Sequence, residues 1–470
     1  MRPVIVWFRR DLRIRDNPAL WNATHSGAPI IPLFIFDQGL IRRLPSDGAV
    51  FDFQAKALED LAGALRGLGG DLILRSGRVL EIHRRLMAEA EPAALYFNRD
   101  YEPAGRSRDA DVEALYASAG IPVHTFQETS IHGPEEVLTG DGRPYVVFTP
   151  YARSWRRLPL PDPLPPPSSL STPALPSSGV LRAAQIGRKT LISSPAASGG
   201  EREAGRRWAR FRSGGLSLYA ARRDIPGEDG TSRLSPFLRF GCISVREMAR
   251  ECRAQVDSHG AGDGGEKFLD ELIWRDFYQA VLSHFPRLTE SSYREEFDRM
   301  RWRFDEGDFA AWREGRTGFP LVDAGMRQLA RTGWMHNRVR MVAASFLTKD
   351  LLHDWRLGAA VFEEQLLDIE TASNIGGWQW SASAGVDPRP MRIFNPRLQS
   401  ERFDPEGAYL RRFIPELQRV PALYIHSPSE MPPAVQKEAG CLIGRDYPAP
   451  IVDHREAAAR FRKAFLSVRG

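Results

Sequence analysis

The chain has 470 residues, 42% hydrophobic and 26% charged, which is the balance of a soluble globular protein with two or three domains. The net charge of +5 is too small to indicate a binding partner by itself, although only 6 of the 64 Lys and Arg residues are lysine. Three widely spaced cysteines exclude a four-cysteine iron–sulfur cluster and indicate no disulfide framework, and we expect no metal site. Because no apolar run reaches membrane-spanning length and the N-terminus does not have the pattern of a signal peptide, we expect a cytoplasmic protein.

Residues 1–130 alternate short apolar runs with longer stretches of helical periodicity, among them Asp52–Leu68 and Arg78–Ala90. The apolar runs are Val4–Phe8, Ile30–Phe36, Leu72–Arg75, Ala94–Phe97 and Pro122–Phe126. Runs of this length suit strands that are buried on both faces of a parallel sheet. The alternation predicts an α/β domain with a doubly wound parallel sheet over residues 1–130.

Residues 131–199 are expected to form an interdomain linker, because 158–178 contain eight prolines and several serines and suit an extended chain. From residue 200 onward the pattern becomes helical. Apolar residues recur at helical spacing in Leu269–Ser283, Leu321–Arg331, Met335–Leu352 and Ala359–Leu367. We therefore expect an all-helical second domain over residues 200–470.

The segment 229–240, DGTSRLSPFLRF, places hydroxyl side chains before a helix that opens near Pro236. The N–H groups and hydroxyls at such a helix start suit a phosphate, although an ordinary helix cap has the same composition. The segment 271–278, ELIWRDFY, puts Glu271, Trp274, Arg275 and Tyr278 on one helix face. A carboxyl beside an indole can hold a planar base, and a surface ion pair beside a core tryptophan is the alternative.

In 333–341, GWMHNRVRM, Asn337 and Met341 lie four residues apart and share a helix face, while Val339, Val342 and Phe346 point toward a core. The segment 368–380, DIETASNIGGWQW, combines two carboxylates, an amide, two glycines and two tryptophans. Glycines are costly inside a helix, so we expect Gly376 and Gly377 to mark a close approach.

These segments, in this order, resemble the DNA photolyase/cryptochrome family over essentially the whole chain. VWFRRDLRIRDNPAL at Val6–Leu20 is similar to the family's opening strand and loop, and TSRLSP, ELIWRDFY, GWMHNRVRM, GGWQW, RIFNP and YPAPIV match in sequence order. The resemblance implies a helical domain that binds FAD, which is active in its reduced form.

The resemblance also implies roles for individual residues. Tyr219 and Thr231, Ser232, Arg233, Leu234 and Ser235 would hold the FAD phosphates, Phe268 and Glu370 would contact the flavin, Arg340 and Asp368 would pair near its ring, and Asn374 would face its N5 atom. Glu271, Trp274, Asn337, Met341 and Trp380 would line the lesion cavity. Arg223, Arg275, Arg338 and Gln399 would contact DNA, and Trp302, Trp355 and Trp378 would carry an electron to the flavin.

Three features favour repair of cyclobutane pyrimidine dimers within this family. Family members that repair (6-4) lesions carry two histidines where this chain has Asn337 and Met341. Cryptochromes place Asp or Cys where this chain has Asn374, and this chain has no long tail after the helical domain. The implied partner is DNA with such dimers, acted on by a monomer without an obligate protein partner, and the alternatives are a cryptochrome-like blue-light photoreceptor and a (6-4) photolyase.

The chain also departs from the family pattern. Phe268 replaces a tryptophan that some members have, and Ile369 and Glu370 replace the common Gly and Asp. For a second, antenna pigment, Ala104 and Gly105 replace the Asn and Glu of the folate-binding type. Asp100 and Arg239 are similar to the type that binds 8-hydroxy-5-deazaflavin, although that type has an arginine at the position of Ala49. The site is expected to hold this pigment, another flavin-like pigment or none.

Overall fold

The computed structural model describes residues 1–43, 48–190, 192–193, 197–259, 264–387 and 391–468. The chain divides into two compact units. Unit 1 comprises Met1–Leu191, Ala197–Ser217 and Ser232–Pro286, and unit 2 comprises Ile192–Ala196, Leu218–Thr231 and Arg287–Gly470. The boundaries at 130 and 199, which rest on composition, stay a prediction.

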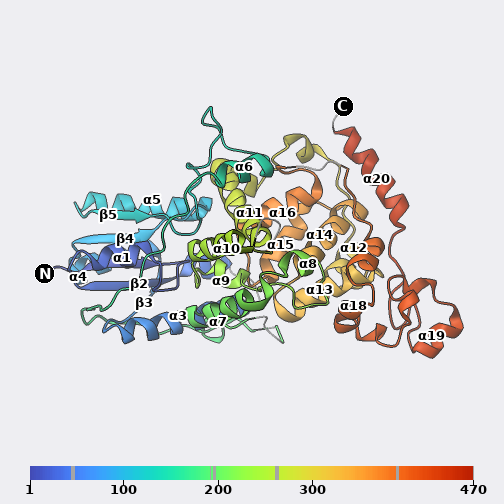
Figure 1. The fold of residues 1–470 in the computed structure, drawn as a ribbon, viewed down its shortest axis with the longest axis horizontal. Coiled ribbons are helices and arrows are strands. Elements are labelled where there is room, and N and C mark those ends of the chain that lie inside the picture. The colour runs from blue at the N-terminus through green and yellow to red at the C-terminus, as the bar shows by residue number, and fades with distance from the viewer. Residues whose placement is uncertain (44–47, 191, 194–196, 260–263, 388–390, 469–470) are drawn as a thin grey trace. The chain divides into compact units, whose positions relative to one another are not determined.

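Unit 1 contains a parallel sheet with the strand order β3-β2-β1-β4-β5 (Figure 1). The strands are Val4–Phe8 (β1), Ile30–Asp37 (β2), Ile73–Gly77 (β3), Ala94–Asn98 (β4) and Val123–Phe126 (β5). The predicted doubly wound sheet is therefore confirmed. Strand β5 begins one residue later than predicted, because Pro122 has no N–H and contributes only its carbonyl, which accepts from the Leu95 N–H over 3.0 Å.

Both faces of this sheet are covered by helices. Trp7, Leu33 and Phe97 point to one face, where they pack with residues of α4 (Val79–Ala90) and α5 (Pro103–Ser118). Alternate residues such as Phe34 and Phe36 point to the other face, where the Phe36 and Phe51 rings lie 5.8 Å apart. That face is covered by α1 (Pro18–Thr24) and α3 (Ala49–Gly67), and α2 (Gln38–Arg43) follows β2.

The loop after β1 forms a buried polar network with Ser244 and with the start of α10 (Val245–His259). Asp16 is fully buried, and its carboxylate accepts from the Arg246 guanidinium over 2.6 and 3.0 Å, from the Ser244 hydroxyl and from the Leu164 N–H over 2.8 Å. Arg13 pairs with Glu128 and donates to the Gly241 carbonyl over 3.0 Å. Buried charges are tolerated when they are paired in this way. The part of the chain that resembles the family's opening motif is thus a structural connection.

The remaining helices of unit 1 lie after the sheet in the chain. They are α6 (Phe148–Trp155), α7 (Glu201–Arg210), α9 (Ser235–Arg239), α10 (Val245–His259) and α11 (Gly264–His284), with a π-helical turn at Phe211–Gly215 and a short 3-10 turn at Ala183–Ile186. Figure 1 shows α7 beside α3. The helix predicted at Leu269–Ser283 is confirmed within α11. In contrast, α6 lies inside the segment expected to be a linker.

Unit 2 is largely helical. Its α-helices are α8 (Tyr219–Arg222), α12 (Glu306–Arg313), α13 (Pro320–Thr332), α14 (Asn337–Ser345), α15 (Trp355–Gln365), α16 (Thr371–Ala382), α17 (Pro396–Phe403), α18 (Ala408–Phe413), α19 (Pro433–Ala439) and α20 (His454–Ser467). A π-helical turn at Phe346–Asp350 continues α14, and Leu352, with a φ of +57°, ends the helical path. The helix predicted over Met335–Leu352 therefore runs from Asn337 to Asp350, with its last turn in the π-helical form.

The core of unit 2 forms around α13, α14, α15 and α16. Val339, Val342 and Phe346 are fully buried in it, as their spacing predicts. Asp354 caps α15 by accepting from the Arg356 N–H over 2.9 Å, so this helix begins earlier than the predicted Ala359. Among the residues that the structure describes, no helix is both long and apolar enough to span a bilayer.

Candidate active site

Helix α14 begins with a histidine cap. The Nδ1 atom of His336 accepts from the Arg338 N–H over 3.2 Å, and the His336 N–H donates to Gln328 Oε1 over 3.1 Å. Burial lowers the pKa of His336 to about 4. The imidazole is therefore neutral near pH 7, and its Nδ1 can accept the hydrogen bond that starts α14.

Asn337 and Met341 occupy one face of α14, as predicted. Asn337 is exposed and Met341 is partly exposed, and the Asn337 Nδ2 atom lies 4.0 Å from the Met341 sulfur. An amide and a thioether side by side offer hydrogen-bonding groups next to a polarizable apolar surface. This combination suits a planar, polar-edged ligand such as a base.

Arg340 and Asp368 form the ion pair that the sequence predicts. The Arg340 Nη2 atom lies 2.7 Å from Asp368 Oδ2, and its Nε atom donates to the Met335 carbonyl over 2.8 Å. The Asp368 side chain is only 2% exposed, and its Oδ1 atom has no hydrogen-bond partner among the described residues. A buried carboxylate oxygen without a partner is costly, which suggests that a ligand supplies a donor.

Helix α16 carries Asn374, Gly377 and Trp380 among its partly exposed residues. The Asn374 amide nitrogen donates to the Ala359 carbonyl over 3.0 Å, so its oxygen is the atom that remains for an external donor. A Cβ atom on Gly377 would meet no chain atom within 4 Å. Glu370 is buried at the start of α16, but its side chain does not cap this helix.

The three tryptophans of the predicted electron route differ in exposure. Trp378 and Trp355 are buried, whereas Trp302 is partly exposed and packs against the core of unit 2. The Trp355 indole donates to Ser292 Oγ over 3.3 Å. The Trp378 ring contacts Trp312, with centroids 6.0 Å apart and planes at 76°. The sequence did not indicate Trp312 as part of the electron route, because every tryptophan outside the family's three matching positions was interpreted as a core residue.

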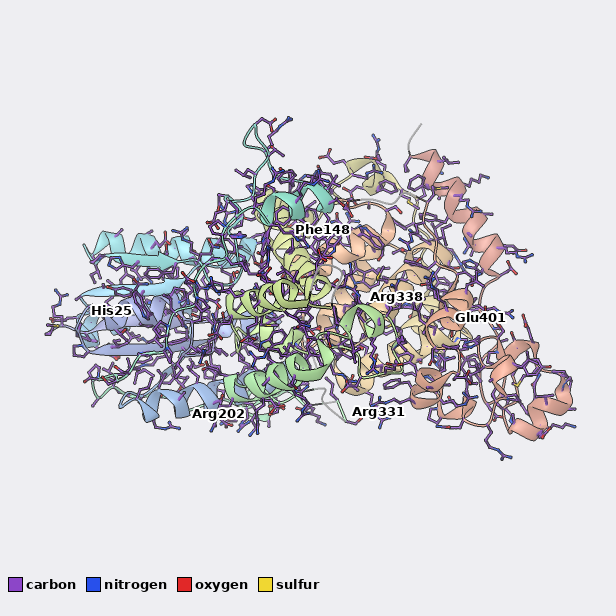
Figure 2. All side chains as sticks on the ribbon, in the orientation of Figure 1. His25, Phe148, Arg202, Arg331, Arg338 and Glu401 are labelled. Atoms are coloured by element: carbon purple, nitrogen blue, oxygen red, sulfur yellow. The ribbon has the colours of Figure 1, made fainter. Side chains whose placement is uncertain are left out.

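The arginines of unit 2 that were predicted to contact DNA have partners within the unit. Arg338 (Figure 2) pairs with Asp224 over 2.8 Å, and its guanidinium lies 4.4 Å from the centre of the Phe403 ring. Arg223 lies 3.9 Å from Asp224, and its guanidinium lies 5.4 Å from the Tyr219 ring centre. Gln399 is partly exposed on α17.

In unit 1, helix α11 presents the predicted face. Glu271, Trp274, Arg275 and Tyr278 are all partly exposed, whereas the intervening Leu272, Ile273, Asp276 and Phe277 are buried. Arg275 donates to the Thr129 carbonyl. The indole of Trp274 stacks on the ring of Phe148 at the start of α6 (Figure 2), with centroids 3.6 Å apart and planes at 4°.

Phe148 was not among the predicted site residues, because residues 131–199 were interpreted as a linker from their proline content. A signal was available in the sequence. The stretch 147–155, VFTPYARSW, carries a Phe, a Tyr and a Trp, with Tyr151 and Trp155 at helical spacing, and contains only one proline. Tyr151 and Trp155 are indeed buried in unit 1.

The predicted phosphate-binding residues fall on both sides of the division between the units. In unit 2, Tyr219 is buried and Thr231 is partly exposed. In unit 1, the Leu234 N–H lies 3.4 Å from Ser232 Oγ, and Ser235 starts α9. Arg233 has a φ of +51°, a conformation that costs energy for a residue other than glycine and is common at functional sites.

Phe268 lies near the start of α11 in unit 1 and is buried. Its ring contacts Trp208, with centroids 5.5 Å apart, and Phe211, with centroids 5.4 Å apart. Phe211 belongs to the π-helical turn of unit 1. Phe268 therefore provides apolar contact and, unlike a tryptophan, no N–H donor.

The chemistry of these groups fits the FAD that the resemblance implies. Within unit 2, the Asp368 Oδ1 atom without a partner and the Asn374 oxygen are acceptors suited to the N–H groups of a flavin ring. The Arg340 guanidinium beside Asp368 supplies a positive charge that suits a reduced, anionic ring.

Comparison with known proteins agrees with these features. Residues 4–168 match the family model described as DNA photolyase, and residues 268–467 match the model described as the FAD binding domain of DNA photolyase. A deoxyribodipyrimidine photo-lyase of Agrobacterium fabrum is 40% identical over 481 residues, which cover 99% of this chain and 98% of that protein.

Solved structures give the same result. A bacterial class III photolyase from Agrobacterium tumefaciens is similar with a TM-score of 0.93 and 39% identity, covering 100% of this chain and 98% of the other. An archaeal photolyase from Sulfolobus tokodaii, whose crystal structure has two FAD molecules, is similar with a TM-score of 0.84 and 32% identity, covering 99% of this chain and 100% of the other. The chain belongs to the DNA photolyase family.

Proposed function

We propose that this protein is a light-driven deoxyribodipyrimidine photo-lyase that repairs cyclobutane pyrimidine dimers in DNA. When bound in its reduced form, FAD would provide the light-driven electron that splits the dimer ring, and the electron would return to it afterwards. The observation that carries the choice of lesion is the Asn337–Met341 pair on the exposed face of α14, where (6-4) enzymes have two histidines. The full-length similarity to a photo-lyase that is 40% identical supports the same activity.

The residue assignments belong to this proposal. Asp368, Arg340 and Asn374 hold the flavin ring, Glu370 and Phe268 contact it, and Tyr219 with residues 231–235 holds the phosphates. The proposed lesion contacts are Glu271, Trp274, Asn337, Met341 and Trp380, and the proposed DNA contacts are Arg223, Arg275, Arg338 and Gln399. Photolyases act on bases that leave the stack, and a damaged, poorly stacked pair costs less to extrude. Phosphate contacts would make binding salt-dependent.

The direct test uses the FAD-loaded, reduced protein with oligonucleotides that contain either a thymine cyclobutane dimer or a (6-4) lesion. We expect blue light to restore the thymines of the dimer substrate, and darkness to leave both substrates unchanged. Absence of light-dependent dimer repair contradicts the proposal. Repair of the (6-4) substrate alone would indicate a (6-4) photolyase, and light-dependent capture of a protein without repair would indicate a photoreceptor.

We also propose that Trp378, Trp355 and Trp302 carry electrons from the surface to an oxidised flavin, because Trp302 is the partly exposed member. Trp302→Phe should slow photoreduction of the oxidised holoenzyme and leave repair by pre-reduced enzyme nearly unchanged. Trp312→Phe is the matched control, since Trp312 contacts Trp378 but is fully buried, with its indole bonded to the Ala343 carbonyl over 3.1 Å. Equally slow photoreduction in both variants would contradict a specific role of Trp302 in carrying the electron.

A second pigment, where the protein carries one, is proposed to be 8-hydroxy-5-deazaflavin or another flavin-like molecule. Asp100 is held between Arg10 at 3.7 Å and Arg108 at 3.4 Å, at the carboxyl end of β4. A Cβ atom on Gly105 would lie 2.3 Å from Asp100 Cγ, so the longer side chain of the folate-binding type would require Asp100 to move away from its present position. The absorption spectrum of the pigments released by denaturation tests this. A released folate would contradict it, and FAD alone would indicate a protein without an antenna.

We propose that the enzyme acts as a monomer in the cytoplasm, with damaged DNA as its required partner. The mass of the holoenzyme measured by light scattering, with and without dimer-containing DNA, tests the oligomeric state. A mass of two chains on one DNA would contradict the monomer.

A further inference from the structure

The contact between Phe148 and Trp274 has an uncommon geometry for two side chains. Their ring centroids lie 3.6 Å apart and their planes differ by 4°, so the two aromatic faces overlap closely. Aromatic pairs usually adopt offset or edge-to-face arrangements with centroids 4.5–7 Å apart. A close parallel stack is therefore held in place by its surroundings, in which both rings are fixed by α6 and α11.

The other neighbours of Trp274 contact it differently. Phe277 meets the indole at 81° with centroids 5.6 Å apart, and Tyr278 lies 5.5 Å away at 31°. Among the described residues, no second ring lies parallel to the indole at stacking distance on the face opposite Phe148. Trp274 is also partly exposed. One face of the indole is thus covered by the Phe148 ring, and the partial exposure of Trp274 leaves part of its surface accessible to a planar ligand.

Asp276, two residues after Trp274, fastens helix α6 to helix α11. Its buried carboxylate accepts from the Trp155 indole over 2.9 Å and from the Ile131 and His132 N–H groups over 3.1 Å. Burial raises the pKa of Asp276 to about 6, against the opposing effect of these hydrogen bonds. Trp155 ends α6, and Phe148 begins it.

Phe277 of α11 also contacts α6, through aromatic rings. Its ring lies 5.9 Å from that of Phe148 at 78° and 5.1 Å from that of Tyr151. With Asp276 holding the far end of α6, both ends of this short helix are fixed to α11. The position of Phe148 over Trp274 therefore follows from contacts along the whole of α6.

We infer that Phe148 is a positioning residue for lesion recognition, which backs one face of Trp274 so that the opposite face can stack on a base of the flipped dimer. The inference rests on the proposed function, in which Trp274 contacts the lesion. A base gains stacking energy from any flat aromatic surface, but an indole that is free to rotate must be ordered when the base binds. Phe148 removes that ordering cost before DNA arrives, because the indole is already held.

The test is a double-mutant cycle with Phe148→Ala, Trp274→Ala and the double variant, all as FAD-loaded protein in the dark. Binding to thymine-dimer DNA and to undamaged DNA of the same sequence is measured. We expect Phe148→Ala to weaken binding to dimer DNA roughly 3- to 10-fold, and to leave binding to undamaged DNA unchanged. In the Trp274→Ala background, removal of Phe148 should have no further effect.

Three further measurements separate positioning from packing. Phe148→Tyr keeps the flat ring and should bind dimer DNA as the wild type does. Phe148→Leu keeps the bulk but not the flat ring, so its affinity for dimer DNA should be as low as that of Phe148→Ala. The leucine variant also replaces the alanine variant in the test if the latter is poorly soluble. The repair rate of Phe148→Ala at saturating dimer DNA should equal that of the wild type, because only the affinity for the dimer is expected to change. Phe126→Ala is the matched control, because Phe126 is a partly exposed ring that stacks in parallel on Tyr96, with centroids 6.3 Å apart and planes at 6°.

Equal weakening on both DNAs, or additive effects of Phe148→Ala and Trp274→Ala, would overturn the inference and leave Phe148 as a packing residue. A wild-type preference for dimer DNA that Phe148→Ala leaves intact would overturn the inference alone. Absence of any wild-type preference for dimer DNA would overturn the proposed function, and the inference with it.

Discussion

Asp16 in unit 1 and Asp368 in unit 2 are both buried carboxylates paired with an arginine, but they differ in how completely they are bonded. Both oxygens of Asp16 have partners, supplied by Arg246, Ser244 and the Leu164 N–H. Asp368 has Arg340 on one oxygen at 2.7 Å, and no partner among the described residues on the other. Burial and ion pairing do not distinguish these two residues, whereas the bonding of the second carboxylate oxygen does.

The difference separates a structural connection from a binding site. A buried carboxylate that serves only the fold is most stable when both of its oxygens are bonded, as in Asp16, because each unmet hydrogen bond reduces stability. Glu128, which pairs with Arg13 in the same network, is less completely bonded, since its Oε2 atom has no partner among the described residues. A site that receives a ligand keeps an acceptor for it, and the stability lost in the free protein is recovered on binding. We therefore expect substitutions at Asp16 to act on unfolding and substitutions at Asp368 to act on FAD.

The largest expected effect is at Asp16. Asp16→Ala leaves the buried Arg246 guanidinium without its carboxylate, which should lower the free energy of unfolding by about 3–5 kcal/mol. Urea unfolding followed by circular dichroism measures this loss. The FAD affinity of the molecules that remain folded should match the wild type, and an intact fold with weakened FAD binding would reverse the comparison.

Acid should weaken the start of α14, which carries Arg340, through His336. The free imidazole binds a proton near pH 6.5, whereas burial lowers the pKa of His336 to about 4 in the folded protein. Between these values the unfolded chain holds more protons, so stability falls as the pH falls, by about 3 kcal/mol over the whole window.

The comparison of wild type with His336→Asn isolates this contribution, because Asn caps a helix well and does not titrate here. We expect the variant to lose less stability than the wild type between pH 6.5 and 4. His83, whose pKa burial lowers to about 3, contributes equally to both proteins and cancels. Parallel stability curves for the two proteins would contradict the role of His336.

A smaller effect is expected at Asp368. Asp368→Asn keeps the shape of the side chain and removes the charge that faces Arg340, so FAD affinity should fall roughly 10- to 100-fold, as expected for a hydrogen bond to a charged group. Fluorescence titration of the apoprotein with FAD measures the affinity. Asp16→Asn is the matched control and should retain FAD affinity. An equal loss of FAD affinity in both variants would contradict a binding role that is specific to Asp368.

The smallest effect is expected at Asn337, which is exposed. Asn337→Ala removes an amide that the proposed function places against the lesion, and should reduce the preference for dimer over undamaged DNA by roughly 3- to 10-fold. Binding to undamaged DNA depends on phosphate contacts and should stay constant. Gel-shift titrations with both DNAs provide the measurement, and a uniform decrease on both would exclude a lesion-specific role.

Much of the fold could be predicted from local sequence patterns. The strands are continuous apolar runs, and a parallel strand covered on both faces leaves such a run. Helical spacing likewise placed Asn337 and Met341 on one face and Val339 in the core. The Arg340–Asp368 pair came from the family resemblance, because two residues separated by a turn and a helix have no local pattern that joins them.

The contacts that the sequence could not predict join residues far apart in the chain. Asp16 and Arg246 are 230 positions apart, and Asp276 and Trp155 are 121 apart. Composition gave no sign of α6, since the prolines of 158–178 determined how the whole of 131–199 was interpreted, and that segment contains α6 and Phe148. The two π-helical turns have no signature in the apolar periodicity, which they interrupt by one residue.

The partnership of Asp16 with Arg246 has a consequence for how the protein is made. During synthesis at about 5–20 residues per second, the 230 positions between them delay this contact by roughly 10–50 s after the first strand has emerged. Until then Asp16 remains hydrated, and the loop after the central strand β1 lacks the polar partners that come from Ser244 and Arg246. A nascent chain that stops near residue 190 should therefore stay open to proteases and chaperones, and the enzyme becomes protected only when α10 leaves the ribosome.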